Sequence, residues 1–183
     1  MLYAWGFERV GVVASDLYFV DPNPSPGQEG AERGVRLEVR LLDRPPLTGS
    51  IYAAQPIVID RPVWRADLFE SVAGPVGSHD RTHHHPGFRG WEPGKRQFDE
   101  ALTQDPMAWL TARLEDLPGL LKGAEIGAEA AGPDDARELA RAAPAIAEVV
   151  RTLLARVRAG ELGRPPEGAS PGEPVTDARV GWL

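Results

Sequence analysis

The sequence of 183 residues contains no cysteine. This absence excludes a disulfide framework, a thiolate metal site and a cysteine nucleophile. Any metal site in the chain must therefore be built from nitrogen and oxygen ligands. A chain of this length can bury roughly 70% of the surface that it exposes when unfolded, so its core needs no covalent support.

Lysine is almost missing, because Lys95 and Lys122 are the only lysines among the twenty basic residues. The arginines are dispersed along the chain and the formal net charge is -7. The sequence thus lacks the basic face that is typical of nucleic-acid-binding proteins. The abundance of alanine, glycine and proline is typical of a high-GC bacterial genome. We expect a bacterial protein with no nucleic-acid partner.

Long apolar runs are also missing. No stretch approaches the roughly 18 residues that a transmembrane helix requires, and the N-terminus lacks the basic and apolar regions of a signal peptide. We therefore expect a soluble, cytoplasmic protein with no membrane partner. The chain also has no P-loop, Rossmann fingerprint, Gly-x-Ser-x-Gly elbow or His-Glu-x-x-His motif that would indicate a particular chemistry.

The first half of the chain has the pattern of β-strands. The clearest alternation places Val35, Leu37 and Val39 between charged residues, which predicts a strand with one face in the core and one in water. Shorter runs predict further strands, and Gly/Pro-rich turns separate them. These runs are residues 3–13, 17–20, 51–54, 57–59 and 64–69. Several short strands with turns between them predict a mainly antiparallel sheet or a small open barrel.

The second half has the pattern of helices. Residues 96–103 predict a short helix, and Asp105-Pro106 is a typical helix start, with Asp as N-cap and Pro in the first helical position. Pro118 should break or kink the helix that follows. A longer helix after Asp135 carries an apolar stripe. The stripe consists of Leu139, Ala143, Ile146, Val150, Leu153 and Val157.

The change of period near the Gly/Pro-rich centre predicts the α+β class. We expect one domain over residues 1–163, β-rich over 1–95 and helical over 96–163. Residues 164–183 should form an extended Pro/Gly-rich C-terminal arm, and its apolar end, residues 175–183 with Trp182, should pack on folded protein. The C-terminal arm or the helical stripe could hold a homo-oligomer together.

All four histidines of the chain lie within residues 79–85, as His79, His83, His84 and His85. Gly/Pro-rich sequence on both sides places them on a loop or a short strand. On an extended backbone, His83 and His85 point to one face and His84 points to the other. Imidazole is the commonest metal ligand in proteins, so this segment is the candidate functional site.

We predict that His79, His83 and His85 bind a divalent metal such as zinc. Alternate Cα atoms lie roughly 6.6 Å apart on a strand, and two imidazoles at that spacing can converge on one ion with bonds of about 2.0–2.1 Å. A carboxylate would complete the site, and the candidates are Asp67, Glu70, Asp80 and Glu92, with Asp67 and Glu92 preferred. Three protein ligands and one water could supply a hydrolase or lyase with its nucleophile.

The run His83-His84-His85 resembles the His-x-His element of the cupin metal site. Cupins carry a glutamate a few residues after the second histidine, whereas here Pro86 follows directly and the first glutamate, Glu92, comes seven residues on. The resemblance is confined to this short segment. It implies metal-ligand roles for His83 and His85.

The segment has other interpretations. It could be a solvated loop, a polar network that holds the loop to the sheet through Asp67 or Asp99, or an anion site that uses Arg81 and Arg89 as donors. The leading hypothesis for the whole protein is a non-enzymatic interaction or oligomeric module. The alternative is a metal- or small-ligand-binding protein, and the sequence leaves open whether it is an enzyme.

Overall fold

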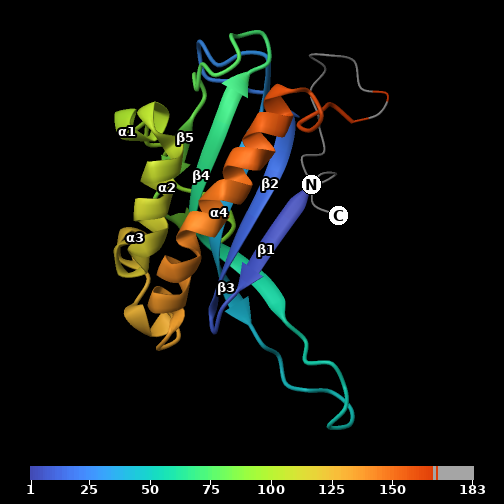
Figure 1. The fold of residues 1–183 in the computed structure, drawn as a ribbon, viewed down its shortest axis with the longest axis vertical. Helices are drawn as coiled ribbons and strands as arrows, with labels where there is room; N and C mark the ends of the chain where they lie inside the picture. The colour runs from blue at the N-terminus through green and yellow to red at the C-terminus, as the bar shows by residue number, and fades with distance from the viewer. Residues whose placement is uncertain (167, 169–183) are drawn as a thin grey trace.

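The computed structural model describes residues 1–166 and 168 and has an α+β architecture (Figure 1). A sheet of five strands forms the N-terminal part, and helices cover one of its faces. The sheet is open and antiparallel, which confirms the predicted fold class and excludes the barrel. The prediction for residues 175–183, Trp182 included, lies outside the described residues.

The five strands lie side by side in chain order, and each pairs antiparallel with the next. Their bounds are β1 Leu2–Gly6, β2 Val10–Val20, β3 Ala31–Asp43, β4 Val58–Ser71 and β5 His83–His85. A separate two-stranded hairpin consists of β6 Phe88–Arg89 and β7 Glu92–Pro93.

Two strand predictions were wrong. Residues 3–13 form the β1–β2 hairpin and not one strand. The chain reverses at residues 7–9, where Asp135 accepts hydrogen bonds from the backbone N–H groups of Glu8 at 2.7 Å and Arg9 at 3.0 Å. This support comes from a distant helix, so no local pattern predicts it. Residues 51–54 lie in the exposed β3–β4 loop, because no strand lies beside them for pairing.

The helices follow the sheet in the chain. Their bounds are α1 Glu100–Gln104, α2 Pro106–Glu115, α3 Leu117–Gly123, the 3-10 helix η1 Ala128–Ala130 and α4 Asp135–Arg158. Asp105 caps α2 as predicted, since its side chain accepts from the N–H of Ala108 at 3.1 Å. Pro118 lies at the start of α3, so the helix breaks there. Among the described residues, none of the helices has the length and apolarity to cross a membrane.

The core lies between the sheet and the helices. The apolar stripe of α4, residues 139–157, is buried and packs on β2 and β3 (Figure 1). The chain's own sheet therefore covers the stripe, which leaves it no surface for a second copy. Trp64 of β4 stacks on Trp109 of α2 with ring centroids 5.9 Å apart. His84 of β5 contacts the Trp109 ring at 5.0 Å and joins this aromatic group.

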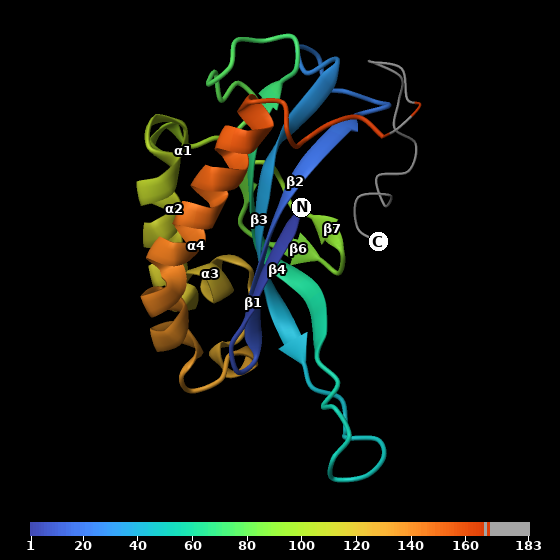
Figure 2. The ribbon, with the colours of Figure 1, turned by 45° about the vertical axis from the view of Figure 1, so that its right-hand side comes forward.

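The opposite face of the sheet is polar and is also buried. Alternate residues of β3, β4 and β5 point there, and Glu38 and Asp67 are only 3% and 1% exposed. The prediction that this face of β3 lies in water was wrong. The β6–β7 hairpin lies on this side, opposite the helices (Figure 2), and Arg40 packs over the ring of Trp91 beside it. The covering segment, residues 86–98, has no periodic pattern that could predict this contact.

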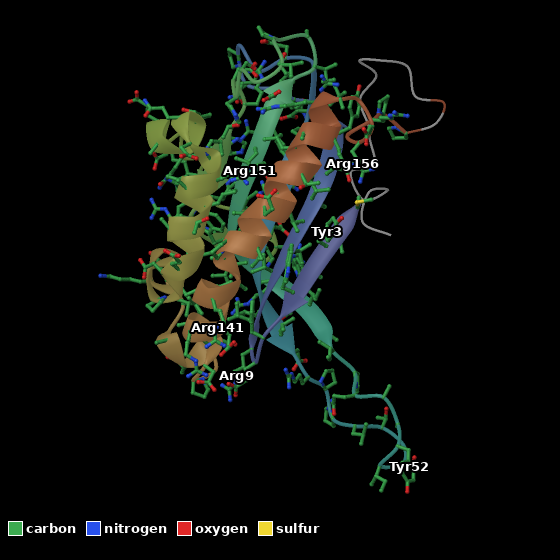
Figure 3. All side chains as sticks on the ribbon, in the orientation of Figure 1. Tyr3, Arg9, Tyr52, Arg141, Arg151 and Arg156 are labelled. Carbon is green, nitrogen blue, oxygen red and sulfur yellow. The ribbon has the colours of Figure 1, made fainter. Side chains whose placement is uncertain are left out.

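The β3–β4 loop, residues 44–57, projects away from the rest of the fold (Figures 1 and 3). Tyr52 lies at its far end (Figure 3) and is 90% exposed, and Ile51 is 84% exposed. Residues 45–59 contain no charged side chain. The loop thus exposes apolar side chains to water, whereas the polar face of the sheet buries charged side chains.

Candidate metal centre

Asp67, His83 and His85 converge on the polar face of the sheet. Asp67 lies on β4 directly opposite His83 of the edge strand β5, and His85 lies two residues further along. The side-chain donor atoms form a triangle. Its edges are 3.1 Å between the two histidine Nε2 atoms, 3.4 Å from His83 Nε2 to Asp67 Oδ2, and 3.7 Å from His85 Nε2 to the same oxygen. Among the described residues, this is the one group with metal-ligand spacing.

The outer nitrogens of both imidazoles are fixed by backbone carbonyls. His83 Nδ1 lies 2.8 Å from the carbonyl oxygen of Arg81, and His85 Nδ1 lies 2.7 Å from that of Gly94. A carbonyl only accepts hydrogen bonds, so each Nδ1 donates its proton. In the neutral rings, the lone pair of each Nε2 then points into the triangle. A backbone carbonyl on the second ring nitrogen is the usual support of a metal-binding histidine.

The Nε2 atoms of His83 and His85 face each other, and in the neutral rings both carry a lone pair. Two lone pairs at 3.1 Å repel unless a cation or a proton lies between them. Burial lowers the pKa of both His83 and His85, and for His85 burial together with the nearby Arg65 guanidinium lowers it to about 4. Both rings are therefore neutral near pH 7, which disfavours the proton. A cationic group beside the two nitrogens relieves this repulsion, and Arg65 Nη2 lies 3.0 Å from His85 Nε2.

Asp67 also pairs with two guanidinium groups. Arg36 Nε donates to Oδ1 at 2.7 Å, and Arg65 Nε lies 2.9 Å from Oδ2. Burial alone would raise the pKa of Asp67, but Arg36 and Arg65 outweigh it and lower this pKa to about 2. Asp67 is thus ionised over the physiological range. Sequence reasoning missed Arg36 as a partner of Asp67, because a charged residue at every second position of a strand is more typical of a solvated face.

Two aromatic rings from the covering segment lie beside the histidines of the cluster. The ring of Phe88 lies 6.4 Å from His85 and that of Phe98 lies 5.8 Å from His83. The two histidines and the aspartate are at most 4% exposed. The three side chains are therefore shielded from solvent in this structure.

The structure separates His79 from the other predicted ligands. Its backbone adopts φ 51°, in the left-handed region, and this turns the side chain toward the C-terminal end of α4. His79 Nε2 lies 2.9 Å from Arg158 Nη2, and Arg158 in turn forms an ion pair with the buried Glu70. This second group joins α4 to the loop before β5 and contains no convergent set of lone pairs.

The remaining predicted carboxylates also lie elsewhere. Glu92 is exposed on β7. Asp80 accepts hydrogen bonds from the N–H of Ser71 and the hydroxyl of Ser78. Asp99 caps α1 and accepts from Trp109 Nε1 at 2.9 Å. Of the carboxylates proposed from sequence, Asp67 alone meets two histidines within the described chain.

No protein-family model matches the sequence, and neither the comparison with curated proteins nor that with solved structures finds a match. The function must be argued from the site itself.

Proposed function

We propose that the protein binds a divalent metal ion of the zinc class through Asp67, His83 and His85. The observation that carries this proposal is the size of the donor triangle. A tetrahedral ion with bonds of about 2.0–2.1 Å separates its ligands by about 3.3–3.4 Å. The three observed edges of 3.1, 3.4 and 3.7 Å bracket this separation.

The donor types support the same class of ion. Two neutral imidazoles and one carboxylate suit zinc and its neighbours, whereas magnesium and calcium prefer all-oxygen sites. Three protein ligands leave one position of a tetrahedral ion free. The site could therefore hold a water molecule or a small ligand on the metal, as in metal-dependent hydrolases and lyases.

The test is a zinc titration of untagged protein that has been stripped with a chelator. We expect one equivalent to bind, and His83→Ala or His85→Ala should abolish binding. His84→Phe is the matched control, because His84 lies between the two ligands on the same strand but packs against Trp64 and Trp109 on the other face. The proposal would be overturned if the wild type bound no zinc. It would also be overturned if the His83→Ala and His85→Ala variants bound zinc as tightly as the wild type.

The β3–β4 loop favours a second function, which is self-association. Its exposed side chains include Leu47, Ile51, Tyr52 and Ile57. Such a contiguous apolar surface marks an interaction site more often than chance exposure does. The loop projects from the fold, and none of its residues is buried by the part of the chain that the structure describes. Since residues 45–59 carry no charge, two copies with net charge -7 could meet there with little repulsion.

Sedimentation velocity tests this second function. We expect the wild type to sediment as a dimer and the variant Ile51→Ser/Tyr52→Ser to sediment as a monomer. Val76→Ser is the control, because Val76 is 60% exposed on a different loop. A monomeric wild type would exclude association through this loop.

A further inference from the structure

The guanidinium group of Arg65 contacts the atoms that would bind a metal ion at this site. Its Nη2 lies 3.0 Å from His85 Nε2, and its Nε lies 2.9 Å from Asp67 Oδ2. These two acceptor atoms are two of the three corners of the donor triangle. A metal ion that binds both atoms would compete with the Arg65 guanidinium for the same lone pairs.

Arg65 makes poorer hydrogen bonds to Asp67 than the neighbouring Arg36 does. Arg36 Nε makes a hydrogen bond of 2.7 Å to Asp67 Oδ1, and its Nη2 makes a second one of 3.4 Å to Oδ2. Arg65 Nε is buried and lies 2.9 Å from Oδ2, but it forms no hydrogen bond of standard geometry within the described structure. Of the two cations beside Asp67, Arg65 is the easier to displace.

A second carboxylate lies within range of a displaced Arg65. Glu38 of β3 is the cross-strand partner of Arg65, is 3% exposed, and points to the same face of the sheet. Directly opposed residues of neighbouring strands have Cβ atoms about 4.5–5.5 Å apart, so oppositely charged side chains there can pair. Glu38 accepts from Arg40 Nε at 2.8 Å. An ionised carboxylate has about four acceptor positions, so Glu38 has the capacity to accept from a second guanidinium.

We propose that Arg65 is the displaceable counter-cation of this site, and that a divalent ion transfers its guanidinium from His85 and Asp67 to Glu38. This inference rests on the metal binding proposed above. Arg65 and Glu38 then set the affinity for the metal ion. In the metal-free protein, Arg65 occupies the donor atoms that the ion needs. In the metal-bound protein, Glu38 pairs with the displaced Arg65. Neither residue is a ligand.

Zinc affinity measured against a chromophoric chelator tests this transfer. Arg65→Met and Arg36→Met each remove one positive charge beside Asp67. Arg65 contacts His85 Nε2 at 3.0 Å and the donor oxygen Oδ2 at 2.9 Å, whereas Arg36 reaches Oδ2 only at 3.4 Å, through Nη2. We expect Arg65→Met to bind zinc about tenfold more tightly than Arg36→Met, a difference of about 1.4 kcal/mol. Arg65→Gln provides a second variant, and circular dichroism with thermal melting verifies that each variant is folded.

The double-mutant cycle with Glu38→Gln separates transfer from a general effect of charge. We expect Glu38→Gln to weaken zinc binding in the wild type and to have no effect in the Arg65→Met background. Equal affinities of the two arginine variants, or an effect of Glu38→Gln that persists without Arg65, would overturn the transfer while the metal site stands. Failure of both wild type and Arg65→Met to bind zinc would overturn the proposed function itself. Binding by Arg65→Met alone would confirm that Arg65 competes with the ion, and would refute binding by the wild type.

Discussion

The face of the sheet that packs against α2 and α4 is apolar, whereas the face beside the β6–β7 hairpin buries carboxylates, guanidinium groups and imidazoles. Both faces belong to the same strands and are withheld from water to a similar degree. The apolar face stabilises the fold by burial alone. On the polar face, each charge is stabilised only by its partners, and a well-packed apolar replacement of such a network is often equally stable. Stability therefore does not account for the chemistry of this face, whereas the proposed metal binding would.

The largest expected effect tests whether the charges depend on one another. Asp67→Leu leaves Arg36 and Arg65 buried without their carboxylate, which should lower the free energy of unfolding by about 3–5 kcal/mol. The triple variant Arg36→Met/Arg65→Met/Asp67→Leu removes the whole group and should lose much less. Urea unfolding measures both. A triple variant as unstable as the single one would show that the network itself stabilises the fold.

The apolar face should respond in a different way. Leu37 is fully buried on β3, and Leu37→Ala should cost about 2–5 kcal/mol through lost burial and the cavity left behind. No second substitution of a neighbour should restore this loss, in contrast to the polar face. The variant should keep the zinc affinity of the wild type at temperatures where it is folded. A changed affinity would show that the two faces are coupled.

The polar face should also make stability depend on pH. Glu32 is 4% exposed there, and burial raises its pKa to about 7, although Arg81 and Arg96 oppose the shift. The folded state thus binds more protons than the unfolded state between the ordinary glutamate pKa and pH 7. The penalty of ionised Glu32 is complete above pH 7 and vanishes as the pH falls toward that ordinary value.

Glu32→Gln should remove this penalty. At about 1.4 kcal/mol per pKa unit, the variant should be more stable than the wild type by on the order of 3 kcal/mol at pH 8, and by little at pH 4.5. Taking the difference between the two proteins cancels the titration of the histidines. Glu148→Gln on the outer surface of α4 is the control. A difference that is independent of pH would contradict the raised pKa.

Zinc should stabilise the protein by mass action. At a free concentration of about 100 times its dissociation constant, a ligand that binds only the folded state adds about 2.7 kcal/mol. Thermal melting should show this rise for the wild type and for His84→Phe, and no rise for His83→Ala. A rise that survives in His83→Ala would place the bound zinc elsewhere.

Local sequence patterns predicted the parts of the site that lie on one strand. The alternation of β5 placed His83 and His85 on one face and His84 on the other, and the structure has them so. Asp67 was among the predicted carboxylates, but its distance from the histidines depends on the β4–β5 register. The role of His79 was not predictable, since its left-handed turn and its contact with Arg158 involve a helix 79 positions away.

The burial of the polar face was not predictable for a related reason. Arg36 lies opposite Asp67 only because β3 and β4 pair in one register, with shifts between Val39 and Arg40. The segment that covers this face is short and aperiodic and leaves Trp91 61% exposed. Strand periodicity shows which residues share a face, but it does not show what covers that face.

The smallest expected effect concerns the β3–β4 loop, whose residues are apolar yet exposed. Asp43 and Val58 pair at the base of the loop, so an Asn-Gly turn can replace residues 44–57 without changing the register. None of these residues is buried, so little packing should be lost. The replacement does remove the hydrogen bond of 2.9 Å from Arg44 Nη2 to the carbonyl oxygen of Phe7. Each halving of loop length recovers about 0.6 kcal/mol of closure entropy, which predicts a gain of roughly 1–2 kcal/mol in the unfolding free energy. Urea unfolding at low protein concentration measures this gain, and sedimentation of the same variant should show a monomer. A gain in stability together with a monomer would support the proposed contact with a second copy; a truncation that destabilises the monomer would instead show that the loop packs against its own chain.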